Sequence, residues 1–358
     1  MKTKRLLSLD IMRGMTIVCM IIVNNGGGPQ SYRHLGHSAW NGITVCDLVF
    51  PFFLFIMGVT TYISLAKTGF APSSVSLRKI FRRTVLIMLI GWAIHWFANV
   101  CYGKGWLDFG HLRLTGVLTR IALCYGVVSL MALSMSRRAM GVTAAALLIV
   151  YGAILLLFNG YENDLSNVNA VVDRFLLSEG FLYTKRPVGP EGILGTVPAI
   201  AHTVIGFCCG ALLMRKESLE VRLLKLFVVA ALLLVGGFIL SGILPENKRI
   251  WSPSYVLITC GMAAALLAAI SYFTDVKGYR KGMAFFESFG VNPLFLYVLG
   301  DIAGIILGAT HARQVIYDWI LGWSVVPELA SAIYAVSLML VCGLVALPLY
   351  RRRIYIKI

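Results

Sequence analysis

The chain has few charged residues, and this scarcity decides its class. Charged residues make up 13% of its 358 residues and hydrophobic residues 58%, against about 25% and ~45–50% in soluble proteins. A soluble protein of about two or three domains is therefore excluded. Repeated apolar runs of roughly 18–22 residues instead match the ~30 Å hydrocarbon core of a bilayer. The sequence predicts a polytopic helical membrane protein.

Familiar catalytic and metal-binding motifs are also missing. There is no HExxH zinc motif, P-loop or dinucleotide-binding fingerprint. The run Gly26-Gly27-Gly28 is not a phosphate loop, because no strand precedes it. The eight cysteines lie mostly within apolar runs without metal-ligand spacing, so we expect core packing, no metal and no disulfide framework. No internal repeat is visible, which weakens an inverted-repeat transporter interpretation.

Basic residues outnumber acidic ones, and the formal net charge is +16. They cluster in short loops between apolar runs, which indicates the positive-inside rule of membrane proteins rather than nucleic-acid binding. Lys2, Lys4 and Arg5 place the N-terminus in the cytoplasm. They precede an apolar run as in a signal peptide, but no small-residue cleavage site follows, so we expect an uncleaved first span.

These patterns predict an all-α bundle of about ten spans, with both termini cytoplasmic. We expect residues 1–358 to form a single transmembrane domain in the inner (cytoplasmic) membrane. Basic loops such as 67–83 lie inside, and loops 102–113 and 159–192 lie outside. The predicted spans cover about residues 8–24, 46–65, 84–100, 114–134, 139–158, 193–214, 224–244, 255–273, 291–309 and 325–350.

The densest cluster of reactive groups lies between the first two spans, in residues 24–58. The glycine run must end the first helix, and the following segment carries His37 and then Asp47. Imidazole titrates near neutrality, so His37 can take and return a proton. Asp47 could orient the ring and stabilise the imidazolium, or it could cap its own helix. His34 could take the place of His37, and the residues leave this choice open.

Two asparagines end the first span. The carboxamide of Asn24 could donate to a developing oxyanion, or it could serve as a C-cap. Asn25 competes for either role. Asn41, in the turn after His37, is a candidate for binding a substrate.

Other polar residues lie within or at the ends of apolar runs. Asp10 and Arg13 are spaced i, i+3 and can pair with each other, or Arg13 can bind an anion that enters from the cytoplasm. Arg120 lies deep in the fourth run and needs a phosphate or a carboxylate as a partner. Glu191 heads the sixth span and Asn292 the ninth, where either could line a polar cavity or cap a helix.

Several stretches resemble the heparan-α-glucosaminide N-acetyltransferase family, in order and over nearly the whole chain. The stretches are 5–28 (RLLSLDIMRGMTIVCMIIVNNGGG), 37–58 (HSAWNGITVCDLVFPFFLFIMG), 116–125 (GVLTRIALCY), 190–200 (PEGILGTVPAI), 251–257 (WSPSYVL), 275–278 (DVKG) and 351–358 (RRRIYIKI).

The resemblance implies a membrane-bound acetyltransferase that uses acetyl-CoA from the cytoplasm and acetylates a glucosamine amine on the far side. Its catalytic histidine corresponds to His37, with Asn24 and Asp47 as its partners. Arg13, Arg120 and basic residues of the inner loops such as Lys277 would then hold the phosphates of coenzyme A. Whether acetyl passes through His37 covalently or moves directly stays open.

The implied partners are an amino sugar and the lipid bilayer, with no nucleic acid, and a homodimer is an assembly that the sequence leaves open. The alternative function is a transporter of amino sugars or acetylated sugars without chemistry. A structural scaffold would explain none of the polar residues inside the spans.

Overall fold

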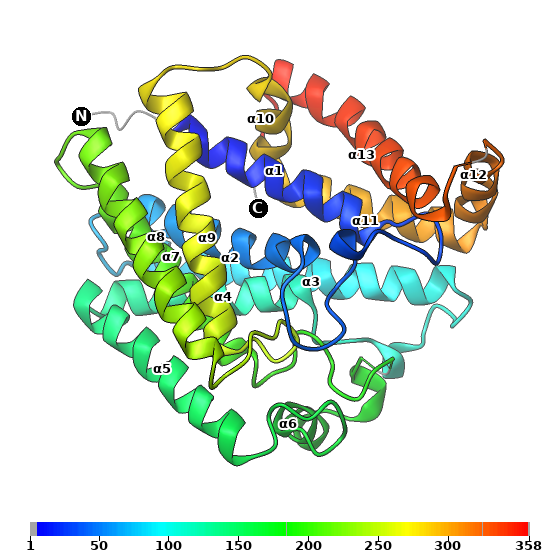
Figure 1. The fold of residues 1–358 in the computed structure, drawn as a ribbon, viewed down its shortest axis with the longest axis horizontal. Coiled ribbons are helices and arrows are strands. Elements are labelled where there is room, and N and C mark those ends of the chain that lie inside the picture. Colours follow the sequence, from blue (N-terminus) through cyan, green and yellow to red (C-terminus); the bar gives the residue numbers. More distant parts are fainter. Residues whose placement is uncertain (1–5, 184, 324, 357–358) are drawn as a thin grey trace.

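The structure is a computed structural model, and it describes residues 6–183, 185–323 and 325–356. Throughout these ranges all regular elements are helical, which confirms the predicted all-α class (Figure 1). Nine of the described helices are long and apolar enough to cross a membrane, and the number rises to ten if one bent helix pair counts as a single span. The described helices thus provide nine or ten candidate spans where about ten were predicted. Lys2, Lys4 and Arg5 lie outside the described residues.

The helices that can span a membrane alone follow the predicted order. They are α1 (Leu7–Asn24), α2 (Val45–Ala66), α3 (Ser74–Cys101), α4 (Val117–Ser134), α5 (Arg137–Leu157), α7 (Thr196–Leu213), α8 (Leu219–Ser241), α9 (Pro253–Ser271) and α13 (Pro327–Arg351). The bent pair is α10 (Met283–Val291) and α11 (Pro293–Ala309), and two further short helices are α6 (Val168–Leu176) and α12 (Ala312–Leu321).

Helix α3 begins earlier than predicted, and a bend that was not predicted precedes the ninth span. Helix α3 begins at Ser74 rather than near residue 84, because Ser73 caps it by accepting a bond from the Ser76 amide at 3.1 Å. The predicted ninth span, at about residues 291–309, corresponds to α11, and the chain turns by 88° between α10 and α11. Pro293 is the first residue of α11 and has no amide hydrogen to continue the preceding helix, so the chain bends there.

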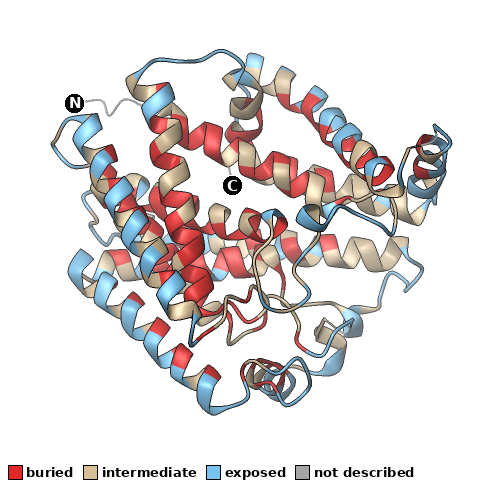
Figure 2. Ribbon diagram, viewed as in Figure 1, coloured by how far each residue is buried: buried red, intermediate tan, exposed pale blue. Residues whose placement is uncertain are grey.

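Helices α1, α2 and α9 form much of the buried centre, whereas α3, α5 and α8 expose long apolar faces (Figure 2). Apolar side chains on these outer faces include Val142 and Ile149 of α5 and Leu232 and Val235 of α8. In a bilayer such faces meet lipid tails, so the exposed apolar surface is what a membrane-spanning bundle requires.

Helix α1 is anchored at its N-terminal end. The amides of Leu7 and Ser8 donate to the two carboxylate oxygens of Asp275 at 3.0 and 3.2 Å. A carboxylate is favourable there because the first amides of a helix lack partners inside it. Further along, Gly14 and Gly290 let α1 and α10 approach closely, since a Cβ on Gly290 would stand 1.8 Å from the Asp10 carbonyl oxygen.

Candidate active site

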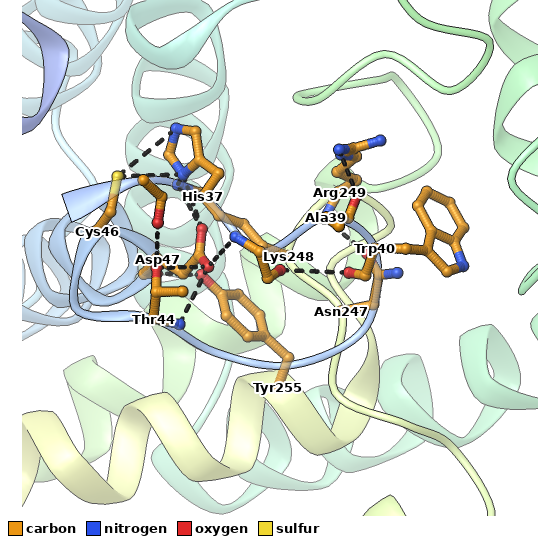
Figure 3. Close-up of polar contacts among 12 residues, drawn as sticks. His37, Ala39, Trp40, Thr44, Cys46, Asp47, Asn247, Lys248, Arg249 and Tyr255 are labelled. Atoms are coloured by element: carbon orange, nitrogen blue, oxygen red, sulfur yellow. Dashed lines mark hydrogen bonds and ion pairs between the residues drawn. The ribbon is translucent and has the colours of Figure 1, made fainter. Parts of the chain in front are cut away.

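His37 is held by the first turn of α2. One oxygen of Asp47, Oδ1, lies 2.8 Å from His37 Nδ1. The other, Oδ2, accepts bonds from the amides of Ser38 and Thr44 at 3.0 and 3.1 Å. Asp47 therefore caps its own helix and orients the histidine at once, so the two roles weighed from the sequence coexist (Figure 3).

The geometry leaves one nitrogen of the ring available for chemistry. When Nδ1 carries a proton and donates it to Asp47, Nε2 keeps its lone pair. The His37 side chain is 53% exposed, whereas that of Asp47 is 1% exposed. His37 also lines a cavity of about 160 Å³ together with Ile22 and Val23 of α1 and Ser331 of α13. The ring of His37 thus contacts the buried carboxylate of Asp47 and also faces the cavity.

Lys248 is a member of this site that the sequence analysis missed. It lies on the loop between α8 and α9, with Nζ 3.4 Å from Asp47 Oδ1 and 3.1 Å from His37 Nδ1 (Figure 3). The position of Lys248 in the sequence could have indicated its importance. Lys248 and Arg249 lie in a predicted outer loop, where the positive-inside rule disfavours basic residues. Two cations in such a loop therefore make it a candidate part of a functional site.

The loop that carries Lys248 is hydrogen-bonded to the loop that carries His37. Asn247 Nδ2 donates to Asn41 Oδ1 at 3.0 Å, and Arg249 donates to the carbonyl of Ala39 at 2.5 Å. The amide of Gly42 donates to the Glu246 carbonyl at 2.8 Å. Asn41, expected to bind substrate, thus joins the two loops.

Cys46 also touches the ring of His37. Its Sγ lies 3.2 Å from Nδ1 and 3.7 Å from Nε2. In a cysteine–histidine catalytic pair, the nitrogen opposite the carboxylate should face the thiol. Here the thiol is closer to the nitrogen that Asp47 already holds. The arrangement therefore points to His37 Nε2 rather than to Cys46 as the reactive atom.

The structure does not bring Asn24 to His37. Asn24 is the last residue of α1, and its side chain lies close to Asp301 of α11. The neighbouring Asn25 is buried and donates to the Ile21 carbonyl at 2.9 Å. His34 is exposed in the short helical turn before His37. Of the two histidines, the structure pairs His37 with the carboxylate of Asp47.

A second, basic cavity lies near the start of α1. Its volume is about 430 Å³, and Arg13, Lys79 and Arg83 line it. Arg13 Nη1 donates to Asp10 Oδ1 and to the Gly290 carbonyl, both at 3.1 Å, so the predicted Asp10–Arg13 pair is present. Phe53, Ile56 and Met57 of α2 form an apolar wall.

Arg120 lies outside both the cavity beside His37 and the basic cavity. Arg120 is buried, donates to the Gly192 carbonyl at 2.8 Å and stacks on Trp251 at 5.0 Å. Its neighbours Leu118 and Ile121 line the basic cavity, whereas Arg120 does not. Arg120 therefore contacts a carbonyl and an aromatic ring, while its buried Nε and Nη1 have no hydrogen-bond partner among the described residues.

Three further candidates have structural partners. Glu191 forms an ion pair with Arg113 at 2.8 Å. Asn292 donates to the Ile354 carbonyl at 2.9 Å and accepts from the Ile356 amide at 2.8 Å, so it holds the C-terminal segment beside the basic cavity. Lys277 lies over the ring of Tyr272 at 5.4 Å.

Comparison with known proteins decides the family. The family model described as heparan-alpha-glucosaminide N-acetyltransferase, catalytic, matches residues 5–241. The chain belongs to this family. The matched segment includes both His37 and Asp47 and ends before Lys248.

Two curated members of the family are similar to the chain. A protein of Homo sapiens named heparan-alpha-glucosaminide N-acetyltransferase is 29% identical over 415 aligned positions, which cover 99% of this chain and 60% of the relative. A protein of Mus musculus with the same name is 28% identical over 353 positions, covering 82% of this chain and 53% of the relative. The chain thus spans somewhat more than half the length of the relatives that it matches.

Proposed function

We propose that this chain is a membrane-bound acetyltransferase. It moves acetyl from acetyl-CoA, entering at the cytoplasmic face, to the amine of glucosamine or of a glucosamine-containing sugar at the opposite face. The observation that carries the proposal is the His37–Asp47 pair beside a cavity, within a segment that matches the family model.

The thioester of acetyl-CoA is already activated, but a protonated amine cannot attack it. The reaction therefore requires a base that deprotonates the amine or a group that first accepts the acetyl. In one route, Nε2 of His37 takes the proton of the acceptor amine, which attacks the thioester carbonyl so that the C–S bond breaks and coenzyme A leaves as its thiolate. In the other route, Nε2 itself attacks the thioester, coenzyme A leaves in the same way, and the acetyl group then passes from the ring to the amine, which releases the imidazole. Asp47 stabilises the positive ring that either route forms. Both routes use the same nitrogen, and both need the accessible face of the ring.

The basic cavity suits the acetyl donor. Lys79 and Arg83 offer cations to the phosphates of coenzyme A, and the apolar wall of α2 suits its less polar arm. Helices α1 and α2 line both this cavity and the one beside His37. From Arg13 to Ile22, α1 rises about 13 Å, so the two cavities lie along the same pair of helices.

The decisive experiment measures transfer of labelled acetyl from acetyl-CoA to glucosamine in proteoliposomes. His37→Ala should lose at least the roughly 10²–10⁴-fold that general-base catalysis supplies, while acetyl-CoA binding is retained. His34→Ala is the matched control, since it removes an exposed histidine three residues away. We expect this control to keep the parent rate.

Two results would overturn the assignment. Near-full turnover in His37→Ala would move the role to His34 or to another group. A parent protein that acetylates no amino sugar but carries one across the bilayer would replace the enzyme by a transporter.

The donor site is tested separately by binding. Lys79→Gln combined with Arg83→Gln should weaken coenzyme A by about tenfold or more, because each removes a charge-assisted hydrogen bond. Arg78→Gln combined with Arg82→Gln is the control, because these exposed residues of the same helix do not line the cavity. Equal affinity in the two double variants would contradict this location.

A further inference from the structure

A third cavity lies apart from both parts of the candidate active site. Its volume is about 790 Å³, within the ~300–1,000 Å³ typical of small-molecule sites. Its lining comes mainly from α5, α7 and α8, and most of it is apolar, as at Leu148, Val204 and Leu233. We call it the α5–α8 groove.

The length of the α5–α8 groove fits one leaflet of a bilayer. Its lining runs from residue 137 to 148 along α5 and from 204 to 215 along α7 and the residues just after it. Either stretch rises about 16 Å at ~1.5 Å per residue. One leaflet contributes half of the ~30 Å hydrocarbon core. The groove therefore matches the depth of one acyl chain.

One end of the groove is basic. Arg137, Arg138 and Arg215 line it there, and no carboxylate is among the described lining residues. The nearby Glu217 is already paired with Lys225 at 2.7 Å. Guanidinium groups bind phosphate oxygens in a bidentate manner, and basic pockets between transmembrane helices take anionic lipid head groups. The charge of the mouth therefore complements a phosphate.

Small residues keep the wall of α5 open. Gly141, Ala144 and Ala145 line the groove, and a Cβ placed on Gly141 would meet no atom within 4 Å. The wall of the groove is therefore open at Gly141.

We propose that the α5–α8 groove binds one anionic phospholipid, with its phosphate on the three arginines and an acyl chain along α5 and α7. The proposal does not depend on acetyl transfer, because the groove shares no lining residue with the cavities beside His37 or Arg13.

The test measures binding of phosphatidylglycerol and of phosphatidylcholine with the same acyl chains to the full-length protein in detergent, by native mass spectrometry. Phosphatidylglycerol should bind more tightly to the parent. Arg137→Gln combined with Arg215→Gln should weaken it by about 25-fold, since each cation near an anionic lipid contributes about fivefold. Gly141→Leu should weaken it as well, by filling the groove while leaving the arginines in place.

Matched controls exist for both changes. Arg78→Gln combined with Arg82→Gln removes two cations of α3, and Gly236→Leu fills open space on α8, in each case outside the groove. Both controls should bind phosphatidylglycerol as the parent does. The proposal fails if phosphatidylcholine binds the parent equally well, if the groove variants bind like their controls, or if coenzyme A displaces the lipid.

Discussion

At the scale of residues, the candidate site centres on one carboxylate shared by two basic groups. Asp47 contacts the imidazole of His37 and the ammonium of Lys248. A buried carboxylate with both partners present has its charge satisfied, and removing one partner leaves a polar group that costs free energy. The orientation of the ring thus depends on Lys248 as well as on Asp47.

We predict that Lys248→Met lowers kcat by about 10- to 100-fold, the effect of losing a hydrogen bond to a charged group. Binding of coenzyme A should persist, because Lys248 does not line the basic cavity. Lys248→Arg should restore part of kcat by returning a cation to Asp47. Steady-state kinetics of acetyl transfer would measure both variants, and an unchanged kcat in Lys248→Met would refute a positioning role.

The residue scale also shows how far the sequence alone could reach. His37 and Asp47 are ten positions apart, so a loop followed by a helix start brings them together by local structure. Lys248 is 211 positions from His37, and only the packing of α9 against α2 places its loop there. Asn24 is close to His37 in sequence, but its side chain does not contact His37. Proximity in sequence was therefore a poor guide for this residue.

At the scale of elements, hydropathy predicts where a helix crosses the bilayer but not how its ends are held. The span over α1 followed from its apolar run and the glycines after it. Its anchoring by Asp275 is a contact over 268 positions, which periodicity cannot reveal. The bend between α10 and α11 had a local cause in Pro293, yet continuous hydropathy concealed it.

We predict that Asp275→Ala lowers the unfolding temperature in detergent, because the amides of Leu7 and Ser8 lose their acceptors. Loss of a capping side chain costs about 1 kcal/mol. Asp275→Asn keeps one acceptor oxygen and should lose less. Thermal unfolding followed by fluorescence would compare the three proteins. The capping role would be wrong if Asp275→Ala melted at the temperature of the parent.

At the scale of the whole molecule, composition sufficed for the class and nearly for the number of spans. Low charge and long apolar runs require helices that satisfy their own backbone groups in lipid, and the described helices are of this kind. Composition could not predict the three cavities described above, because their positions depend on how the helices pack against one another. It does supply an expectation for orientation, since basic residues gather in alternate loops.

We predict that the loop after α2 faces the cytoplasm and that the loop before α6 faces the opposite side. Single cysteines at exposed positions test this in a background in which the eight native cysteines have been replaced. Thr68→Cys reports on the first loop and Ser166→Cys on the second, and both positions are exposed. An impermeant thiol reagent added outside intact cells should label position 166 and reach position 68 only after permeabilisation. Labelling of position 68 alone from outside would invert the topology, and acetyl-CoA could then no longer enter the basic cavity from the cytoplasm.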